Sequence, residues 1–201
     1  MSTTTPWLTL RDTPLAGLSV IERSVREDTR GFFTRLFCAD EFAALGLHEH
    51  AASIAQVNHS HTRRLGAVRG MHFQRPPHAE AKVVSCLRGE VFDVAVDLRR
   101  GSPTFLQWHG EVLSAANHRS LAVPCGFAHG FQALTDECEL VYLHSHRYVP
   151  SADGGVSPGD AALAIAWPLP VAELSARDAG HAPITSSFNG LNTDPPSDPA
   201  S

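Results

Sequence analysis

Histidines are numerous in this chain of 201 residues, which contains 12 of them. Three pairs are spaced as His-x-His: His48/His50, His59/His61 and His144/His146. In a strand this spacing places both imidazoles on one face, and metal-binding β-barrels use such a pair with a carboxylate and a third histidine. However, no acidic residue follows His61 until Glu80, and the first pair lies beside a predicted helix. The pattern therefore favours surface or hydrogen-bonded histidines over a metal centre.

Polar side chains are concentrated in two segments, residues 56–60 and 69–74. The second contains Arg69 and His72, which are more polar than a buried strand needs, and Gly70 interrupts them. A glycine inside a strand often marks a bulge or a close approach of backbone, and a bulge would let Arg69 and His72 converge. An edge strand with solvated polar groups explains the same pattern, so the residues alone leave both interpretations open.

Two residue types are rare enough to indicate specific roles. Lys82 is the only lysine among the 16 lysines and arginines, and Tyr142 and Tyr148 are the only tyrosines. An ammonium and a guanidinium differ in shape and hydration, so a chain that otherwise uses arginine indicates a need for an ammonium at position 82. Tyr142 lies within a predicted strand and shares a face with His144.

Two further positions could contribute to a polar cavity. Asp93 shares a strand face with Asp97, and two carboxylates on a barrel strand are either solvated or enclosed in such a cavity. His129 lies between Gly126 and Gly130, where the absence of side chains would let a ligand approach the backbone.

The elements that must position these residues are mostly strands. A helix is predicted over residues 39–45, with Asp40 as a cap and Gly46 as a stop. Strands are predicted at residues 18–25, 32–37, 55–58, 82–87, 91–98, 107–113, 120–123, 130–134 and 139–146. Frequent turn signals with almost no helix between strands indicate an all-β sandwich or closed barrel. A parallel α/β fold would need crossover helices, which the pattern lacks.

One pair of strands has an internal pattern of its own. Residues 82–87 and 91–98 flank a turn at Arg88-Gly89, in hairpin-like order. In the second strand, alternation places Phe92, Val94, Val96 and Leu98 on one face and Val91, Asp93, Ala95 and Asp97 on the other.

Composition and charge exclude several classes of protein. A formal net charge of −5 argues against a general binder of nucleic acid or membrane surfaces. The N-terminal segment lacks the apolar run of a signal peptide, and no stretch approaches the roughly 18 apolar residues of a membrane span. The four separated cysteines are typical of reduced cytoplasmic thiols, mostly buried. We expect one domain over residues 1–186 and a flexible tail over residues 187–201, rich in proline and aspartate.

Taken in order, the motifs resemble those of the dTDP-4-dehydrorhamnose 3,5-epimerase family. They are Asp28-Thr-Arg-Gly-Phe-Phe33, Gln56-Val-Asn58, Arg69-Gly-Met-His-Phe-Gln74, Lys82, the segment from Arg88 to Asp97, Gly101-Ser-Pro-Thr-Phe105, Gly126-Phe-Ala-His-Gly-Phe131, Tyr142, Tyr148 and Leu174-Ser-Ala-Arg-Asp178. The resemblance covers about residues 18–183. It implies a cupin-like jelly roll with a few short helices, a homodimer, a nucleotide-linked 4-keto-6-deoxyhexose as substrate, and no metal or other cofactor.

The resemblance also assigns roles to individual residues. His72 matches the catalytic base, Asp178 the carboxylate paired with it, Tyr142 the acid on the opposite face of the sugar, and Lys82 the cation beside the 4-keto oxygen. The substrate contacts that it implies are Arg30, Gln56, Asn58, Arg69, His129 and Tyr148, the last stacking on the base. These types suit the reaction, since a C4 ketone acidifies C3–H and C5–H, and inversion needs a base, an enolate stabiliser and an acid.

The chain departs from the family pattern near the expected sugar site. Arg35 stands where many members have a glutamate, and Asp153-Gly-Gly155 replaces a glutamate-containing loop. We keep Arg35, Asp153 and Asp93 as candidate substrate-binding residues. Three alternatives remain: an epimerase that inverts one carbon only, a metal-dependent cupin oxygenase or isomerase, and a sugar-nucleotide binding module. Against the last, binding alone does not need an acid and a base.

Overall fold

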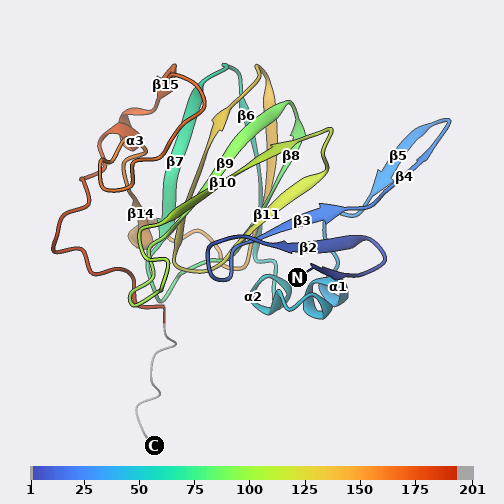
Figure 1. Cartoon of the computed structure of the whole chain (residues 1–201), viewed down its shortest axis with the longest axis horizontal. Helices are drawn as coiled ribbons and strands as arrows, with labels where there is room; N and C mark the ends of the chain where they lie inside the picture. The colour runs from blue at the N-terminus through green and yellow to red at the C-terminus, as the bar shows by residue number, and fades with distance from the viewer. Residues whose placement is uncertain (1, 194–201) are drawn as a thin grey trace, which may run out of the picture.

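The computed structural model describes residues 2–193 of the chain. Within that range two mainly antiparallel sheets face each other (Figure 1). The seven-stranded sheet has the order β1 (Ser2–Thr4), β2 (Leu8–Asp12), β3 (Ser19–Arg23), β11 (Arg119–Val123), β8 (Lys82–Arg88), β13 (Cys138–His144) and β6 (Gln56–Thr62). The six-stranded sheet has the order β10 (Trp108–Ser114), β9 (Glu90–Asp97), β12 (Phe127–Ala133), β7 (Ala67–Gln74) and β14 (Asp153–Gly155), with β15 (Glu173–Leu174) also paired to β7.

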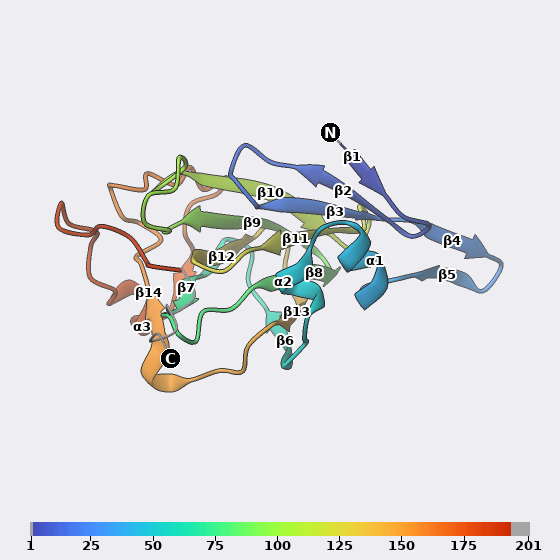
Figure 2. The same ribbon diagram turned by 90° about the horizontal axis from the view of Figure 1, so that it is seen from below.

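The remaining elements lie at the margins of this sandwich. The helices are α1 (Ala39–Ala44), α2 (His48–Ala51), α3 (Ala176–Ala179) and a short 3-10 helix at Pro150–Ala152. Strands β4 (Val25–Asp28) and β5 (Gly31–Thr34) form a separate hairpin, which extends away from the body in both views (Figures 1 and 2). The prediction of an all-β fold with a few short helices is confirmed.

The main core lies between the two sheets. Val84 and Leu121 from the seven-stranded sheet pack with Ala95 and Phe131 from the six-stranded one, and none is more than 1% exposed. A second cluster lies under α1, where Phe42 is fully buried. Burying one such side chain is worth about 1.5–3 kcal/mol, so the core fixes the two sheets on which the polar cavity described below is built.

Each strand predicted from the sequence overlaps an observed strand, and the helix predicted over residues 39–45 corresponds to α1. The alternation predicted along β9 is also confirmed. Val91 and Ala95 belong to the core between the sheets, whereas Val94, Val96 and Leu98 pack on the opposite side.

The hairpin predicted from residues 82–87 and 91–98 is wrong. β8 pairs with β11 and β13 in one sheet, while β9 pairs with β10 and β12 in the other. The turn at Arg88-Gly89 is real, with φ of 75° at Gly89, but it carries the chain from one sheet to the other. The apolar faces of both strands meet in the core, which a flat hairpin would not achieve.

Part of the expected C-terminal tail packs on the body. Phe188 stacks on Phe105 with ring centroids 6.0 Å apart, and Leu191 exchanges backbone hydrogen bonds with Leu98 and Arg100. These contacts extend the ordered chain past residue 186. Residues 194–201 of the expected tail lie outside the described residues.

Candidate active site

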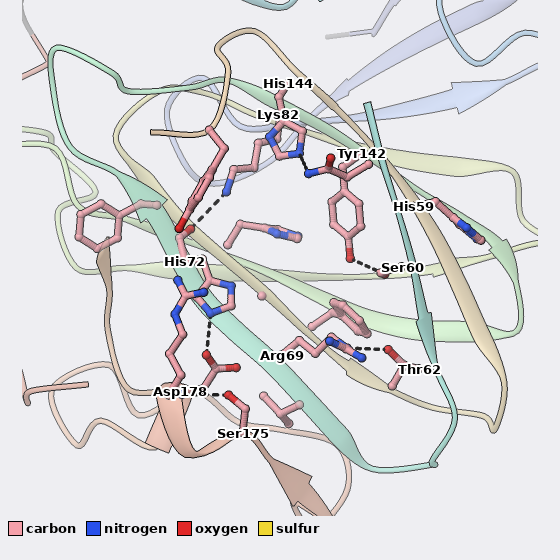
Figure 3. Close-up of a pocket in the computed structure, with 18 of the residues that line it drawn as sticks. His59, Ser60, Thr62, Arg69, His72, Lys82, Tyr142, His144, Ser175 and Asp178 are labelled. Atoms are coloured by element: carbon pink, nitrogen blue, oxygen red, sulfur yellow. Dashed lines mark hydrogen bonds and ion pairs between the residues drawn. The ribbon is translucent and has the colours of Figure 1, made fainter. Parts of the chain in front are cut away.

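A cavity of about 1010 Å³ opens between the two sheets, and most of the candidate residues line it (Figure 3). His72 and Arg69 reach it from β7 and His129 from β12, all in the six-stranded sheet. Asn58, Lys82 and Tyr142 reach it from β6, β8 and β13 of the other sheet. The remaining candidates that line it are Tyr148, Asp153 and Asp178. A ligand in this cavity is therefore flanked by side chains from two opposed walls.

His72 and Asp178 form a hydrogen-bonded dyad on the first wall. His72 Nε2 lies 2.7 Å from Asp178 Oδ1, and Asp178 Oδ2 accepts a second hydrogen bond from the Gly70 backbone N–H at 3.1 Å. Burial raises the pKa of Asp178, but the hydrogen bonds from His72 and Gly70 outweigh it and hold that pKa below its usual value. The ionised carboxylate accepts the proton on His72 Nε2, so the lone pair is on Nδ1, the other ring nitrogen. Figure 3 shows the His72 side chain pointing into the cavity.

Burial also affects the basicity of His72. Desolvation lowers its pKa, while Asp178 opposes that shift. The imidazole is therefore neutral at neutral pH and can accept a proton, as a general base must.

The backbone around His72 depends on two glycines that face each other. A Cβ added to Gly70 would lie 2.6 Å from Gly130 Cα and 2.9 Å from the His129 carbonyl oxygen. The pairing of β7 with β12 shifts register between His129 and Phe131. The bulge predicted at Gly70 is thus found as a register shift between β7 and β12, at a place where their backbones approach closely. The alternative of an edge strand is excluded, because β7 pairs on both sides.

Asp178 is positioned by the start of α3. Ser175 is the N-cap of this helix, and its hydroxyl oxygen accepts from the Asp178 backbone N–H at 3.0 Å. This cap and the contact with Gly70 hold the carboxylate from both ends, which fixes the orientation of the His72 ring.

Lys82 enters the cavity beside a buried carboxylate. Its Nζ lies 3.0 Å from Glu80 Oε1, and Glu80 Oε2 accepts from His144 Nδ1 at 3.1 Å and from Gln74 Nε2 at 3.0 Å. Burial raises the pKa of Glu80, but His144 and Lys82 outweigh it and lower that pKa to about 2. This carboxylate, ionised at neutral pH, holds the Lys82 ammonium, which is only 7% exposed, at a fixed place in the cavity.

Tyr142 lies on the second wall, opposite the dyad. Its hydroxyl is 3.0 Å from Ser60 Oγ, and its ring packs edge-on to His129. Burial raises the pKa of Tyr142 above its usual value, so the phenol keeps its proton at neutral pH and can donate it. A group that can accept a proton and a group that can donate one therefore face the cavity from different sheets.

His129 is oriented by a fully buried carboxylate. Its Nε2 lies 2.9 Å from both Asp93 oxygens, and Asp93 is 0% exposed. Burial raises the pKa of Asp93, and His129 opposes the shift. Asp93 does not line the cavity, so it acts on a ligand only through His129.

A cationic and aromatic rim surrounds the remainder of the cavity. Arg69 donates to Thr62 Oγ1 at 2.9 Å and to the His61 carbonyl at 3.1 Å, both uncharged oxygens, which leaves its charge available to an anionic ligand. Tyr148 lines the cavity and is 50% exposed. Asp153 is paired with Arg177, also a lining residue.

Besides Asp93, three candidates lie outside the lining of the cavity. Gln56 donates to the Asn58 side chain at 3.0 Å and accepts from the Tyr148 backbone N–H at 2.9 Å, so it supports two lining residues. Arg35 pairs with Glu41 at 2.9 Å and lies over the Trp7 ring. Arg30 is on the projecting hairpin, where its side chain is 88% exposed and paired with Asp28. None of these is a lining residue of this chain's cavity.

The sequence interpretation missed Ser60, Glu80 and Arg177. Ser60 could have been found, since it alternates with Asn58 on the inward face of β6. Glu80 precedes β8 and Arg177 belongs to α3, so no strand periodicity indicates where their side chains point.

Within the described residues, the two histidines of each His-x-His pair contact separate partners. His59 and His61 face Glu139 and Glu137, at 3.1 and 2.7 Å. His50 lies on α2 rather than on a strand, and its Nε2 is hydrogen-bonded to the Val123 carbonyl oxygen. His144 belongs to the Glu80 network, apart from His146, whose Nδ1 bonds to a backbone carbonyl.

The fold and the cavity together define an acid–base enzyme built on a cupin-like jelly roll. A family model described as dTDP-4-dehydrorhamnose 3,5-epimerase matches residues 12–186. The dTDP-4-dehydrorhamnose 3,5-epimerase of Salmonella typhimurium is 43% identical over 168 residues, covering 83% of this chain and 90% of the relative. The dTDP-4-dehydrorhamnose 3-epimerase of Streptomyces niveus is 44% identical over 170 residues, covering 84% and 80%.

Solved structures agree with the sequence relatives. The crystal structure of the Legionella pneumophila dTDP-6-deoxy-D-glucose-3,5-epimerase, in complex with dTDP-4-keto-L-rhamnose, superposes with a TM-score of 0.84 at 37% identity. It covers 93% of this chain and 100% of that one. The chain belongs to the dTDP-4-dehydrorhamnose 3,5-epimerase family and is an isomerase of the epimerase type. The resemblance drawn from the motifs is thereby confirmed.

Proposed function

We propose that this chain inverts C3 and C5 of a dTDP-linked 4-keto-6-deoxyhexose by proton transfer between the two walls of the cavity. The observation that carries the proposal is the placement of the His72–Asp178 dyad on one sheet and Tyr142 on the other. Removal of a proton on one face and its return on the other is inversion. Each such acid–base partner is worth roughly 10²–10⁴ in rate.

Lys82 stabilises the intermediate in this scheme. Loss of a proton from C3 or C5 places negative charge on the C4 oxygen, and a fixed ammonium beside that oxygen lowers the energy of the enolate without reorganising during the reaction. The buried Glu80 carboxylate keeps Lys82 oriented, so the cation is in place before the substrate arrives.

The rim of the cavity suits a nucleoside diphosphate. Arg69 offers its charge to the pyrophosphate, and the half-exposed Tyr148 ring offers a surface on which the base stacks. In support, the Legionella relative was crystallised with a dTDP-linked keto sugar.

We further propose that the enzyme is a homodimer in which the β4–β5 hairpin of each chain reaches its partner. Phe32 and Phe33 on this hairpin are 59% and 64% exposed, more apolar surface than a hairpin should present to water. The prediction of Arg30 as a substrate contact fits this arrangement, because the hairpin extends away from its own cavity.

We place the enzyme in the cytoplasm, on the support of its four free thiols. No helix among residues 2–193 is long and apolar enough to span a membrane.

Incubation with dTDP-4-keto-6-deoxyglucose in deuterated water tests the function. The expected result is deuterium at both C3 and C5 and a product with both centres inverted, as judged by mass and NMR. Because one relative is a 3-epimerase, exchange confined to C3 would replace the proposal by single-carbon epimerisation. If neither C3 nor C5 exchanges its hydrogen, the proposal is overturned. The variant His72→Ala is expected to show no exchange at either of these carbons.

A further inference from the structure

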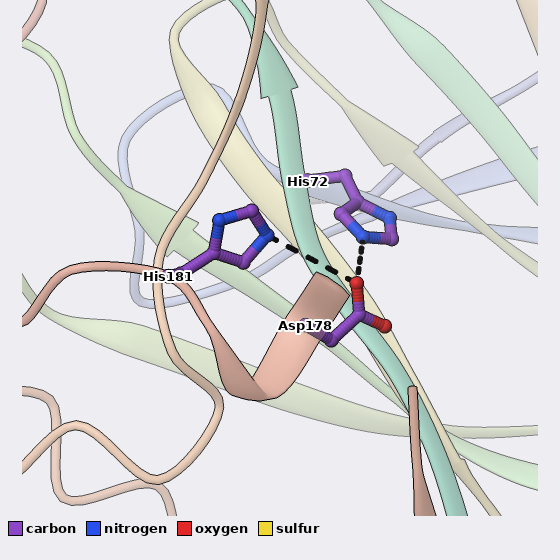
Figure 4. Close-up of side chains that lie close together, drawn as sticks. All are labelled: His72, Asp178 and His181. Atoms are coloured by element: carbon purple, nitrogen blue, oxygen red, sulfur yellow. Dashed lines mark hydrogen bonds and ion pairs between the residues drawn. The ribbon is translucent and has the colours of Figure 1, made fainter. Parts of the chain in front are cut away.

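Asp178 lies between two imidazoles, and only one of them serves the dyad. Its Oδ1 is 2.7 Å from His72 Nε2 on one side and 3.9 Å from His181 Nε2 on the other (Figure 4). His181 Nε2 is buried and has no hydrogen-bond partner in the described part of the chain. Buried polar nitrogens are nearly always satisfied, and an exception points to a missing water or ion. The three donor atoms all lie within 4.8 Å of one another.

Local packing holds His181 in this position. It follows α3, directly after the C-cap Gly180, and its ring lies against Gly155 of β14, where an added Cβ would overlap the imidazole. Asp178 Oδ2 is already taken by the Gly70 N–H, which leaves Oδ1 as the carboxylate atom shared by the two rings. The positive charge of Arg177 acts on His72, but its guanidinium is paired with Asp153, which compensates part of that charge before a cation binds.

We propose that His72, Asp178 and His181 form an inhibitory binding site for a divalent transition-metal ion of the Zn²⁺ class. Two imidazole nitrogens and one carboxylate oxygen are a ligand set typical of Zn²⁺, with a fourth position for water. In a Zn²⁺ site each donor atom lies about 2.0–2.2 Å from the ion. To reach these distances around a central ion, the two imidazole nitrogens and the carboxylate oxygen need to move by about 1 Å or less. His181 lies outside the lining of the cavity, and its role in this site is separate from the reaction.

The inhibition follows from the chemistry of imidazole. A neutral ring carries one N–H and one lone pair. In the dyad the proton is on Nε2, facing Asp178, and Nδ1 is the base. A metal ion can bind Nε2 only in the other tautomer, in which the lone pair is on Nε2 and the proton has moved to Nδ1. The nitrogen that faces the cavity then carries the proton and cannot accept one from substrate. This part rests on the proposed role of His72 as base, whereas ion binding does not.

Binding is tested on the metal-free full-length chain without nucleotide, because pyrophosphate chelates Zn²⁺. Titration calorimetry with Zn²⁺ and visible absorption with Co²⁺ should show one site per chain, and His181→Asn should weaken binding by about tenfold or more, since even loss of an outer partner of a metal ligand costs about 10–100-fold. His146→Asn is the matched control, because His146 lies beside His78 (ring centroids 5.2 Å apart) in another imidazole pair. Absence of a stoichiometric site, or equal affinities in wild type and His181→Asn, would overturn the site.

Inhibition is tested by deuterium wash-in on the same three proteins at matched free Zn²⁺. Zn²⁺ should stop exchange in wild type and His146→Asn, with recovery on adding a chelator, whereas His181→Asn should keep its exchange rate within about twofold. A thermal melt and a second variant, His181→Gln, guard against a folding defect. If Zn²⁺ binds through His181 and exchange continues, the inhibition is overturned while the ion site stands. If no protein exchanges even without metal, the proposed function fails and the calorimetry still decides the site.

Discussion

His72 and Tyr142 are held by different kinds of partner, and this difference supports the roles proposed for them. His72 is oriented by an ionised carboxylate at 2.7 Å, which supports a positive charge on the ring after it accepts a proton. Tyr142 is held by a neutral hydroxyl at 3.0 Å in a buried setting that favours the protonated phenol. Environments that push two groups toward opposite protonation states mark a base and an acid.

Replacing Tyr142 with Phe tests the acid directly. The change removes one hydroxyl and keeps the ring, so the fold should survive, with Ser60 left to bond water. His72 and Lys82 still generate the enolate, which is reprotonated mainly from the face it came from. We expect deuterium exchange at C3 or C5 to outrun inversion by about 10²-fold, the lower range for losing a general acid.

Exchange and inversion must be measured on one sample of that variant. A parallel fall of both would show that Tyr142 shapes the site rather than delivering a proton. Ser60→Ala is the matched control, because it removes the partner of the hydroxyl and leaves the phenol in place; its exchange and inversion should stay coupled.

Glu80 gives a prediction about stability and pH. Hydrogen bonds and charge from His144 and Lys82 lower the pKa of Glu80 from its ordinary value of 4.5 to about 2 in the folded chain. Its ionisation therefore stabilises the fold above the unfolded pKa by an amount on the order of 3 kcal/mol. This contribution is lost as pH falls from about 4.5 toward 2. Glu80→Gln should therefore lower the free energy of unfolding most at pH 7, and its difference from wild type should shrink at about pH 3.

Urea denaturation of both proteins across that range checks this expectation. Glu90→Gln, at a partly exposed glutamate of β9, is the control and should differ little from wild type at any pH. A Glu80→Gln penalty that stays constant with pH would mean that packing, not the charge, stabilises this position.

The sequence allowed the chemistry to be predicted better than the supports of that chemistry. The rare residues Lys82, Tyr142 and Tyr148 all line the cavity, as expected. Glu80 was missed because its carboxylate meets Lys82 and His144 only after two strands pair. Which residues could react is a property of type and spacing, whereas which residues orient them depends on tertiary contacts.

At the scale of elements, the close pairing of β7 and β12 determines the orientation of the His72 side chain. Gly70 and Gly130 let the two backbones approach more closely than any side chain allows, and the register shifts at the same place. His72 and His129 are aligned partners across this pair. The close pairing therefore brings two cavity histidines together from strands about 50 residues apart in the chain, within the short spacing of paired strands.

The change Gly70→Ala tests this close pairing. The added Cβ would clash with Gly130 Cα at 2.6 Å, and φ of 129° is strained for alanine. Overpacking and strain together should cost about 2–5 kcal/mol of unfolding free energy. Gly101→Ala is the control: its φ is also positive, at 74°, but no atom lies within 4 Å of the added Cβ, so only backbone strain should appear. Chemical denaturation of the two variants separates the terms, and equal losses would contradict a role for the close pairing.

Strand existence could be predicted from alternation, but strand pairing could not. The Arg88-Gly89 turn has the local signature of a hairpin, yet β8 and β9 enter different sheets. A turn signal reports a change of direction, and the partner of each strand is chosen by which apolar faces meet in the core.

At the scale of the whole molecule, the β4–β5 hairpin is the element that the fold of one chain does not explain. It forms its own two-stranded sheet, points away from the body and exposes two phenylalanines and Arg30. In a dimer with two-fold symmetry, each hairpin would serve the other chain's surface, and an arginine at its tip would reach the other chain's cavity rather than its own.

A mixed-dimer experiment separates the two arrangements. Arg30→Ala should weaken substrate binding, and His72→Ala should abolish exchange, when each is made as a homodimer. Co-expressed at equal levels with different affinity tags, the two chains should form hybrids. If Arg30 acts in the partner's cavity, one site of each hybrid has an intact His72 and an intact Arg30, because they come from different chains. With half of the dimers hybrid and one of two sites restored, activity should return to about a quarter of wild type in the mixture.

If Arg30 acts within its own chain, every site of the hybrid lacks one of the two groups, and the purified hybrid should show no gain over the Arg30→Ala chains alone. A hybrid without that gain would therefore contradict the exchange of hairpins, and a hybrid with it would place Arg30 opposite the His72 of the other chain.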